Sequence, residues 1–234
     1  MKKYFLFILA ILALQSLYLK AQVFERKTLK AGQNWYEFVY YLFPAFTDGI
    51  VKIKNGGQAT PKMNFNMMLC QMQFIGPHGD TLSFTNPEEI DSIRLNSKSF
   101  FYRKIYFEIL SGFGSVSLVV SRTVNYNPVK IGAMGFRTQG ASIDSYATLT
   151  EQNDTKQLIL NVDVDMALES TYFLMQKNGE MAIANKSNFL KLFGENKPGI
   201  EGYLRTNKIN FNKESDLMGL LEFCAKPEPT SSGS

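Results

Sequence analysis

The amino-acid sequence predicts an α+β protein, with a mainly antiparallel β domain followed by a small C-terminal helical unit. Three observations predict this fold class. Aromatic and β-branched runs recur from Trp35 onward, clusters of turn-forming residues separate them, and apolar residues adopt helical spacing only near the end of the chain. We therefore expect a curved sheet or two packed sheets over residues 33–184 and a helical unit over residues 185–225.

The N-terminus has the layout of a secretory signal peptide over residues 1–21. Lys2 and Lys3 precede an apolar run over residues 4–14, and Ala21 offers a cleavage site. This run is shorter than the roughly 20 residues that a membrane-spanning helix needs, although an uncleaved anchor is the alternative. We expect export to the periplasm, the outer cell surface or the extracellular space. Contact with a membrane is then expected only during export, with no transmembrane span in the mature chain.

The charge of the chain is concentrated in the predicted signal peptide. Removing residues 1–21 takes away three lysines and no acid, which lowers the formal net charge from +4 to +1. Nucleic-acid binding depends on clustered Lys and Arg, and the nearly neutral remainder has no long basic run. We therefore expect no nucleic-acid partner.

Turn-forming residues divide the β domain into hairpins. Asn55–Gly56 and Asn178–Gly179 are Asn-Gly pairs, the strongest short signal for a tight hairpin turn. The segment "FIGPHGDTL", residues 74–82, packs Gly, Pro and Asp between two apolar runs and predicts another turn with His78 at its tip. We expect a strand over residues 67–75 and a long irregular segment over residues 125–150.

Three short helices are expected at the C-terminal end. The first ends at Gly194, the second has Pro198 in its first turn, and Asn212 can cap the third. Leu217 and Leu220 belong to an apolar stripe on the third helix that also includes Leu221 and Cys224. Isolated helices of this length are marginal in water, so we expect them to pack on each other or on the sheet. The segment 226–234 is rich in Pro, Ser and Gly and is expected to be a disordered tail.

The two cysteines allow two interpretations. Alternation places Cys70 on the inward face of the strand expected over residues 67–75, and Cys224 lies on the apolar stripe of the last helix. In an exported protein the pair could form a disulfide that joins the last helix to the sheet. Alternatively, both remain buried free thiols, which are common and inert.

The sequence offers few residues for catalysis. His78 is the only histidine, and a turn tip gives it no nucleophile to activate, so we name no catalytic residue. One histidine and two distant cysteines do not make a zinc site. No P-loop, dinucleotide-binding fingerprint or EF-hand loop is present, and we expect neither a metal nor a cofactor.

Acidic and aromatic residues leave two functions open. Carboxylates gather at Glu88, Glu89 and Asp91 and at Asp163 and Asp165, and a glycosidase needs only two well-placed carboxyl groups. Such clusters are more often solvated surface. Aromatic side chains on an exposed sheet face could bind sugar rings or a protein, although aromatic core packing is the commoner role. The candidate ligand-binding residues are Trp35, Tyr36, Tyr40, Tyr102 and Tyr106.

Three stretches of the chain resemble a family of exported proteins of Gram-negative bacteria that has no assigned activity. They are "YLFPAFTDGIVKIKNG", "MNFNMMLCQMQFIGPHGDTL" and a C-terminal block that begins "YFLMQKNGEMAIANKSNFLKLFG". The resemblance covers most of the mature chain, supports export and supplies no catalytic residue. Cys70 stands where we expect an acidic residue in relatives, which argues against a disulfide common to the family.

Two hypotheses about function follow. The favoured one is a non-catalytic exported protein that binds an envelope component, either a glycan or a protein partner. It rests on the hairpin scaffold, the aromatic residues, the near-zero charge and the lack of a competent catalytic set. The alternative is a carboxylate-dependent hydrolase that acts on a polysaccharide. Two carboxyl groups facing each other across a cleft would favour the hydrolase.

Overall fold

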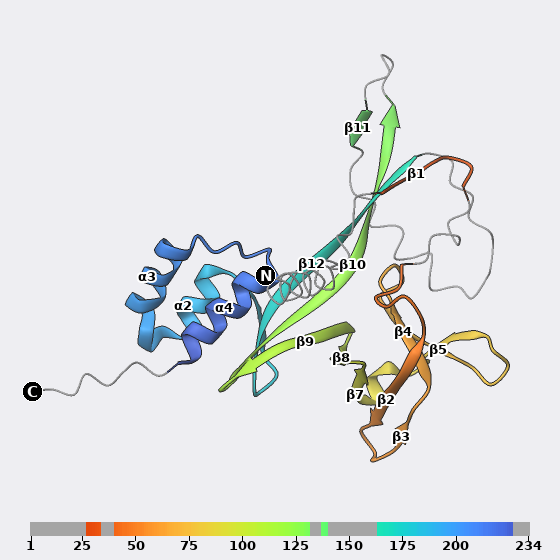
Figure 1. Ribbon diagram of the computed structural model, residues 1–234, viewed down its shortest axis with the longest axis horizontal. Helices are drawn as coiled ribbons and strands as arrows, with labels where there is room; N and C mark the ends of the chain where they lie inside the picture. The colour runs from red at the N-terminus through yellow and green to blue at the C-terminus, as the bar shows by residue number, and fades with distance from the viewer. Residues whose placement is uncertain (1–26, 34–39, 132–136, 140–162, 227–234) are drawn as a thin grey trace, which may run out of the picture.

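The structure is a computed structural model that describes residues 27–33, 40–131, 137–139 and 163–226. The predicted signal peptide, Trp35, Tyr36 and residues 227–234 of the predicted tail lie outside these ranges. The predicted fold class is confirmed, because an open, mostly antiparallel sheet is followed by three short helices (Figure 1).

The sheet follows the order β1-β12-β10-β9-β8-β7-β2-β4-β5-β6, while β11, β13 and β3 extend β10, β12 and β2. Its strands are β1 (Lys27–Leu29), β2 (Thr47–Ile53), β3 (Gln58–Ala59), β4 (Lys62–Asn66), β5 (Gln71–Ile75), β6 (Thr81–Ser83), β7 (Ile90–Leu95), β8 (Lys98–Arg103), β9 (Ile105–Phe113), β10 (Val116–Ile131), β11 (Arg137–Gln139), β12 (Val164–Gln176) and β13 (Met181–Ile183). The helices are η2 (Pro87–Glu89), α2 (Lys186–Leu192), η4 (Gly194–Asn196), α3 (Lys197–Asn207) and α4 (Glu214–Ala225).

The predicted hairpin turns are confirmed. Gly56 and Gly179 have φ angles of 90° and 85°, a backbone conformation that glycine adopts without steric cost. They connect β2 to β3 and β12 to β13. The segment "FIGPHGDTL" forms the turn between β5 and β6, closed by a 2.8 Å hydrogen bond from the Gly76 amide to the Asp80 carbonyl. His78 is exposed in this turn, as predicted.

Two predicted boundaries in the β domain are wrong. Residues 67–70 form a turn before β5, because the Asn66 side chain accepts hydrogen bonds from the amides of Met68 and Leu69 and ends β4. Cys70 has a φ of 52° in this turn, so it does not share a strand face with Met72. The segment expected to be irregular from residue 125 continues β10 to Ile131, because β12 pairs with it as far as Pro128.

One helix start differs from the prediction, whereas Pro198 lies in the first turn of α3 and Gly194 directly follows Phe193, the C-cap residue of α2, both as predicted. Lys213, rather than Asn212, precedes α4, and the Asp216 carboxylate in the first turn accepts a 3.1 Å hydrogen bond from the Asn210 amide in the segment before the helix. The chain after α2 enters η4 directly at Gly194.

Buried side chains form two hydrophobic cores. The first core lies among the strands and includes Leu29, Met63, Phe65, Met72, Ile93, Leu95, Phe100, Tyr106 and Met166. The second core joins the helices to one end of β10 and β12, and includes Leu118, Val120, Tyr172, Leu174, Phe189, Ile200, Leu217, Leu220, Leu221 and Cys224. The helices therefore pack on the sheet as expected (Figure 1). None of them, within the part of the chain that the structure describes, is long and apolar enough to cross a membrane.

Candidate functional site

A row of polar side chains crosses the sheet where the two cores meet. On β10, Val120 belongs to the second core and Val124 to the first, and Arg122 lies between them on the same face. On β12, Ser170 is the direct partner of Arg122 and lies between Leu168 and Tyr172, which contact the first and second core respectively. The boundary between the cores therefore runs across these strands.

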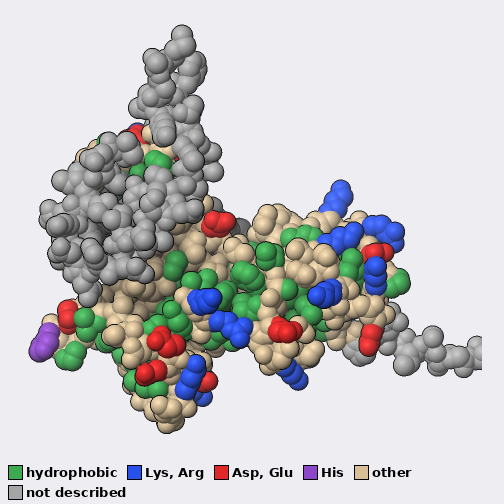
Figure 2. Space-filling model, turned by 180° about the vertical axis from the view of Figure 1, so that it is seen from behind, with side chains coloured by type: hydrophobic (Ala, Val, Ile, Leu, Met, Phe, Trp, Pro, Cys, Tyr) green, Lys and Arg blue, Asp and Glu red, His purple; other side chains and the backbone are tan. Residues whose placement is uncertain are grey.

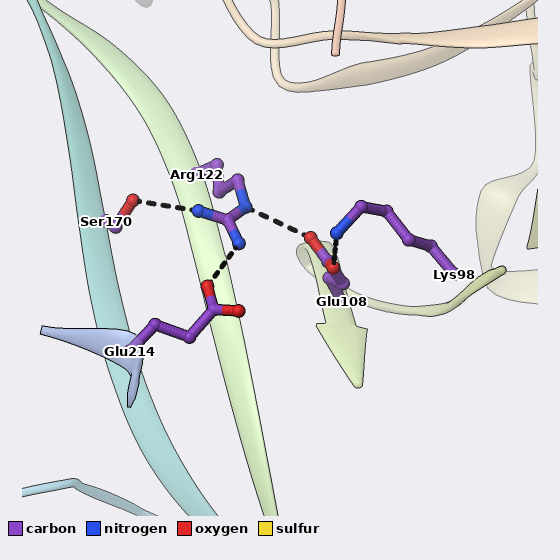
Figure 3. Close-up of polar contacts among 5 residues, drawn as sticks. All are labelled: Lys98, Glu108, Arg122, Ser170 and Glu214. Carbon is purple, nitrogen blue, oxygen red and sulfur yellow. Dashed lines mark hydrogen bonds and ion pairs between the residues drawn. The ribbon is translucent and has the colours of Figure 1, made fainter. Parts of the chain in front are cut away.

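Five residues form what we call the boundary cluster: Lys98, Glu108, Arg122, Ser170 and Glu214 (Figure 3). Arg122 donates from Nε to Glu108 at 3.0 Å and from Nη2 to Glu214, in the first turn of α4, at 2.8 Å. It also donates from Nη1 to the Ser170 hydroxyl at 3.3 Å, while Lys98 binds the second oxygen of Glu108. One arginine thus joins three strands and a helix.

The ion pairs of the boundary cluster stabilise its side chains in their charged forms. The Glu108 side chain is only 3 % exposed, yet both of its oxygens have a cationic partner. Burial by itself lowers the pKa of Arg122, but the charges and hydrogen bonds of Glu108 and Glu214 outweigh burial and raise it. The gap lined by Glu108 and Arg122 is too small for a water molecule. This arrangement suits structural pairing and leaves no room for a substrate beside Glu108.

The carboxylates that were candidates from the sequence lie outside the boundary cluster. Glu88, Glu89 and Asp91 are exposed in and after η2. Asp165 accepts a 2.6 Å hydrogen bond from Thr28, and Asp163 accepts one of 3.0 Å from the Ala31 amide. The two aspartates therefore hold β1 against β12.

A cavity of about 200 Å³ lies beside the turn between β4 and β5. Its lining comes from that turn, β5, β6, η2, β8 and β9: Leu69, Cys70, Gln71, Met72, Ser83, Phe84, Pro87, Tyr102, Lys104, Ile105 and Tyr106. No aspartate or glutamate is part of this lining. The cavity combines apolar and aromatic walls with a few polar groups, which is typical of small-molecule sites.

Two tyrosines form the aromatic wall of this cavity. Tyr102 and Tyr106 are paired across β8 and β9, and their rings meet edge to face with centroids 5.0 Å apart. The Tyr106 hydroxyl is buried and has no hydrogen-bond partner among the described residues. An unsatisfied buried hydroxyl costs about 1–3 kcal/mol, so this hydroxyl, which water does not reach, lowers the stability of the fold locally.

Two further residues of the lining have strained backbones. Cys70 and Lys104 have φ angles of 52° and 64°, and only two other described residues apart from glycine, Asn96 and Lys208, have positive φ. Cys70 ends the turn between β4 and β5, and Lys104 lies between β8 and β9, where a tight connection of antiparallel strands calls for positive φ. Sequence reasoning did not identify Lys104 as part of this lining.

The other predicted site residues lie apart from this cavity or outside the described ranges. Tyr40 is half-buried against the first core, and Tyr106 is itself part of that core, so these tyrosines do not make an exposed aromatic strip. Trp35 and Tyr36 fall outside the described residues. The structure brings together Tyr102 and Tyr106 of the five candidates.

Both cysteines are free thiols in the structure. Cys224 is buried in the second core, where burial raises its pKa to about 12, and burial also raises the pKa of Cys70. The Cys70 thiol faces the Met67 carbonyl at 3.8 Å. Thiols whose pKa values are raised in this way are poor nucleophiles.

Comparison with known proteins adds no assignment. No protein-family model, curated protein or solved structure matches the chain. The fold and the two sites define the protein's class: an α+β protein with an open antiparallel sheet, a partly buried charged cluster between two cores, and a cavity of about 200 Å³.

Proposed function

We propose that this protein is a non-catalytic exported protein that binds a component of the cell envelope, either a glycan or a protein partner. The observation that carries the proposal is the cavity lined by Tyr102 and Tyr106. Aromatic rings beside polar side chains such as Gln71 and Ser83 suit a sugar ring, which has apolar C–H faces and polar edges. The glycan is therefore the favoured partner.

The arrangement of the acidic residues supports binding over hydrolysis. A glycosidase places two carboxyl groups about 5–9.5 Å apart on either side of the scissile bond. The cavity has no carboxylate in its lining, and Glu108 and Glu214 are both bound to Arg122, which occupies the place between them. These carboxylates are engaged in structure, so the hydrolase is the weaker hypothesis.

The export part of the proposal rests on the sequence. The predicted signal peptide ends at Ala21, and the stretches quoted above resemble exported proteins of Gram-negative bacteria. Figure 2 shows acidic and basic side chains interspersed over the visible face of the described part, which suits a neutral partner better than a polyphosphate.

A retention experiment tests the proposal. The purified protein is mixed with native envelope material that has been left intact, treated with protease, or treated with glycan-degrading enzymes. We expect retention that survives protease and is lost after glycan digestion, with no new reducing ends released by the protein. Retention that only protease abolishes would identify a protein partner. Release of reducing ends would instead establish the hydrolase, and the absence of retention on all three materials would contradict the proposal.

A further inference from the structure

We propose that residues 22–26, the first five after the predicted cleavage site at Ala21, dock as a strand along an open edge of β12 between β1 and β13. This inference goes beyond the proposed function, because it concerns how the processed chain completes its own sheet. It draws on the pairing of β12, on the direction of its backbone groups, and on the length of the open edge.

The outer edge of β12 is paired only at its two ends. Because β10 pairs with β12 along its whole length, β1 and β13 must both lie on the other side of β12. β1 pairs with residues 164–166, at the end of β12 remote from the helices (Figure 1), and β13 pairs with residues 173–175. The Ala184 amide adds a 2.8 Å hydrogen bond to the Tyr172 carbonyl. In the described ranges, no strand pairs with residues 167–171 on this side, which we call the edge gap.

Backbone groups of β12 point into the edge gap. Alternate residues of an antiparallel strand direct their N–H and C=O groups to opposite sides. The Tyr172 carbonyl points to the β13 side, since it accepts the hydrogen bond from Ala184, and the pairing of β10 with β12 continues without a register shift. Leu168 and Ser170 therefore direct their amides and carbonyls to the same side. Such an edge is a template on which another strand can add.

The chain that precedes β1 leads directly along the edge gap. β1 is antiparallel to β12, with Lys27 opposite Met166, so the chain before Lys27 runs from β1 towards β13. Continuing this register places residues 22–26 opposite residues 167–171. Residues 22–26 lie outside the described ranges, and this placement follows from the register of β1 alone.

The length of the edge gap matches the length of the segment. The gap spans residues 167–171, and residues 22–26 are the five that separate Ala21 from β1. In the same register Ala21 would lie opposite Tyr172, whose carbonyl is already bound by the residue after β13. A longer strand would have to leave the sheet at this point, whereas a chain that begins after Ala21 fills the gap.

The side chains of the segment suit this position. Val and Phe, which strands favour, alternate with polar residues in "QVFER". The register places Val23 on the same face as Leu168 and Tyr172, which contact the two cores. It places Arg26 on the other face, as the diagonal neighbour of the exposed Glu169. Burial of an apolar side chain and a pair of opposite charges would both stabilise the added strand.

Hydrogen exchange followed by NMR tests the docking in the ¹⁵N-labelled chain of residues 22–234. We expect the Leu168 and Ser170 amides to be protected, and to exchange at least about tenfold faster in a chain that begins at Lys27. The Glu169 amide is the internal control, because it points to β10 and should stay protected in both chains.

Two proline variants test the register without shortening the chain. Glu25 lies opposite Leu168 in the proposed register, so its N–H points to β12 and Glu25→Pro should expose the Leu168 and Ser170 amides. Arg26→Pro is the matched control, because the Arg26 N–H points away from β12 and proline is tolerated at such edge positions. These variants also decide the question if the shortened chain fails to fold.

Each other result would overturn part of the proposal. Fast exchange of Leu168 and Ser170 in the chain of residues 22–234 would show that the edge gap is open. Protection that survives both the shortening and Glu25→Pro would assign the gap to another occupant, and a dependence on protein concentration would identify a second copy. Equal effects of Glu25→Pro and Arg26→Pro would overturn the register. The experiment contains no glycan, so its failure leaves the proposed function standing.

Discussion

Replacing Glu108 by glutamine tests whether the boundary cluster holds the two cores together. Glu108→Gln keeps the size of the side chain and removes its charge. Arg122 then loses one of its two carboxylate partners and keeps Glu214 at 2.8 Å. Lys98 is 30 % exposed and can turn towards water, so most of the loss falls on Arg122, which is 15 % exposed.

The magnitude follows from this geometry. Breaking a fully buried ion pair costs about 3–5 kcal/mol, whereas a hydrogen bond to a charged group contributes about 1.5–3 kcal/mol. Because Arg122 retains one partner, we expect the lower range, about 2–3 kcal/mol of unfolding free energy. For a domain of this size each kcal/mol lowers the melting temperature by about 2–4 °C, which makes the change readily measurable.

The assay is urea and thermal unfolding of the wild type, Glu108→Gln, Arg122→Met and the double variant. We expect the double variant to lose less than the sum of the single losses, since both changes remove the same contact. Glu222→Gln is the matched control, because Glu222 forms an exposed 3.0 Å pair with Lys226 and should contribute no more than about 0.5 kcal/mol. Equal losses for Glu108→Gln and Glu222→Gln, or strict additivity in the double variant, would refute the reasoning.

Two further predictions concern the second core. Leu220 is fully buried there, so Leu220→Ala should cost about 2–5 kcal/mol of unfolding free energy. The control is His78→Ala at the exposed turn, which should change the unfolding free energy by less than about 0.5 kcal/mol. Equal melting temperatures for the two variants would contradict the packing of α4 on the sheet. Burial raises the pKa of the Cys224 thiol from 9.0 to about 12, so above about pH 9 the thiol ionises in the unfolded chain while it stays protonated in the folded protein. This difference favours unfolding, so the stability of the folded protein falls as the pH rises from about 9 towards 12. Cys224→Ala should therefore lose less stability than the wild type between pH 7.5 and 10.5 (roughly the window set by that shift) in urea unfolding, and an identical loss would show that another group is responsible.

Local signals were sufficient to predict three of the hairpin turns and the three C-terminal helices, but not the turn over residues 67–70. Asn55–Gly56 and Asn178–Gly179 need only their own backbone preference to form turns, and Pro198 needs only its missing amide hydrogen to begin a helix. The end of β10 depends instead on pairing with β12, which is more than thirty residues away at Pro128 (partner Val164). Periodicity in a single segment does not contain that information.

The candidate sites were harder to predict for a similar reason. Tyr102 and Tyr106 were recognised as candidates because aromatic residues stand out, but their shared cavity depends on how the turn at Cys70 approaches β8 and β9. The boundary cluster left one signal in the sequence. Glu108 and Arg122 flank a long uncharged run, and their strand neighbours are mainly apolar. Buried charges in apolar strands require partners, although the partner from α4 could not be named.

The boundary cluster also determines how β10 and β12 align. Sliding one strand by two residues keeps every side chain on its present face, so the apolar pattern alone tolerates such a slip along this ladder, which runs from Val116 to Pro128. Moving β10 by two residues would place Arg122 opposite Leu168 or Tyr172 instead of Ser170 and, because β10 also pairs with β9, would separate it from Glu108. One charged row thus excludes alternative registers that hydrophobic burial would accept.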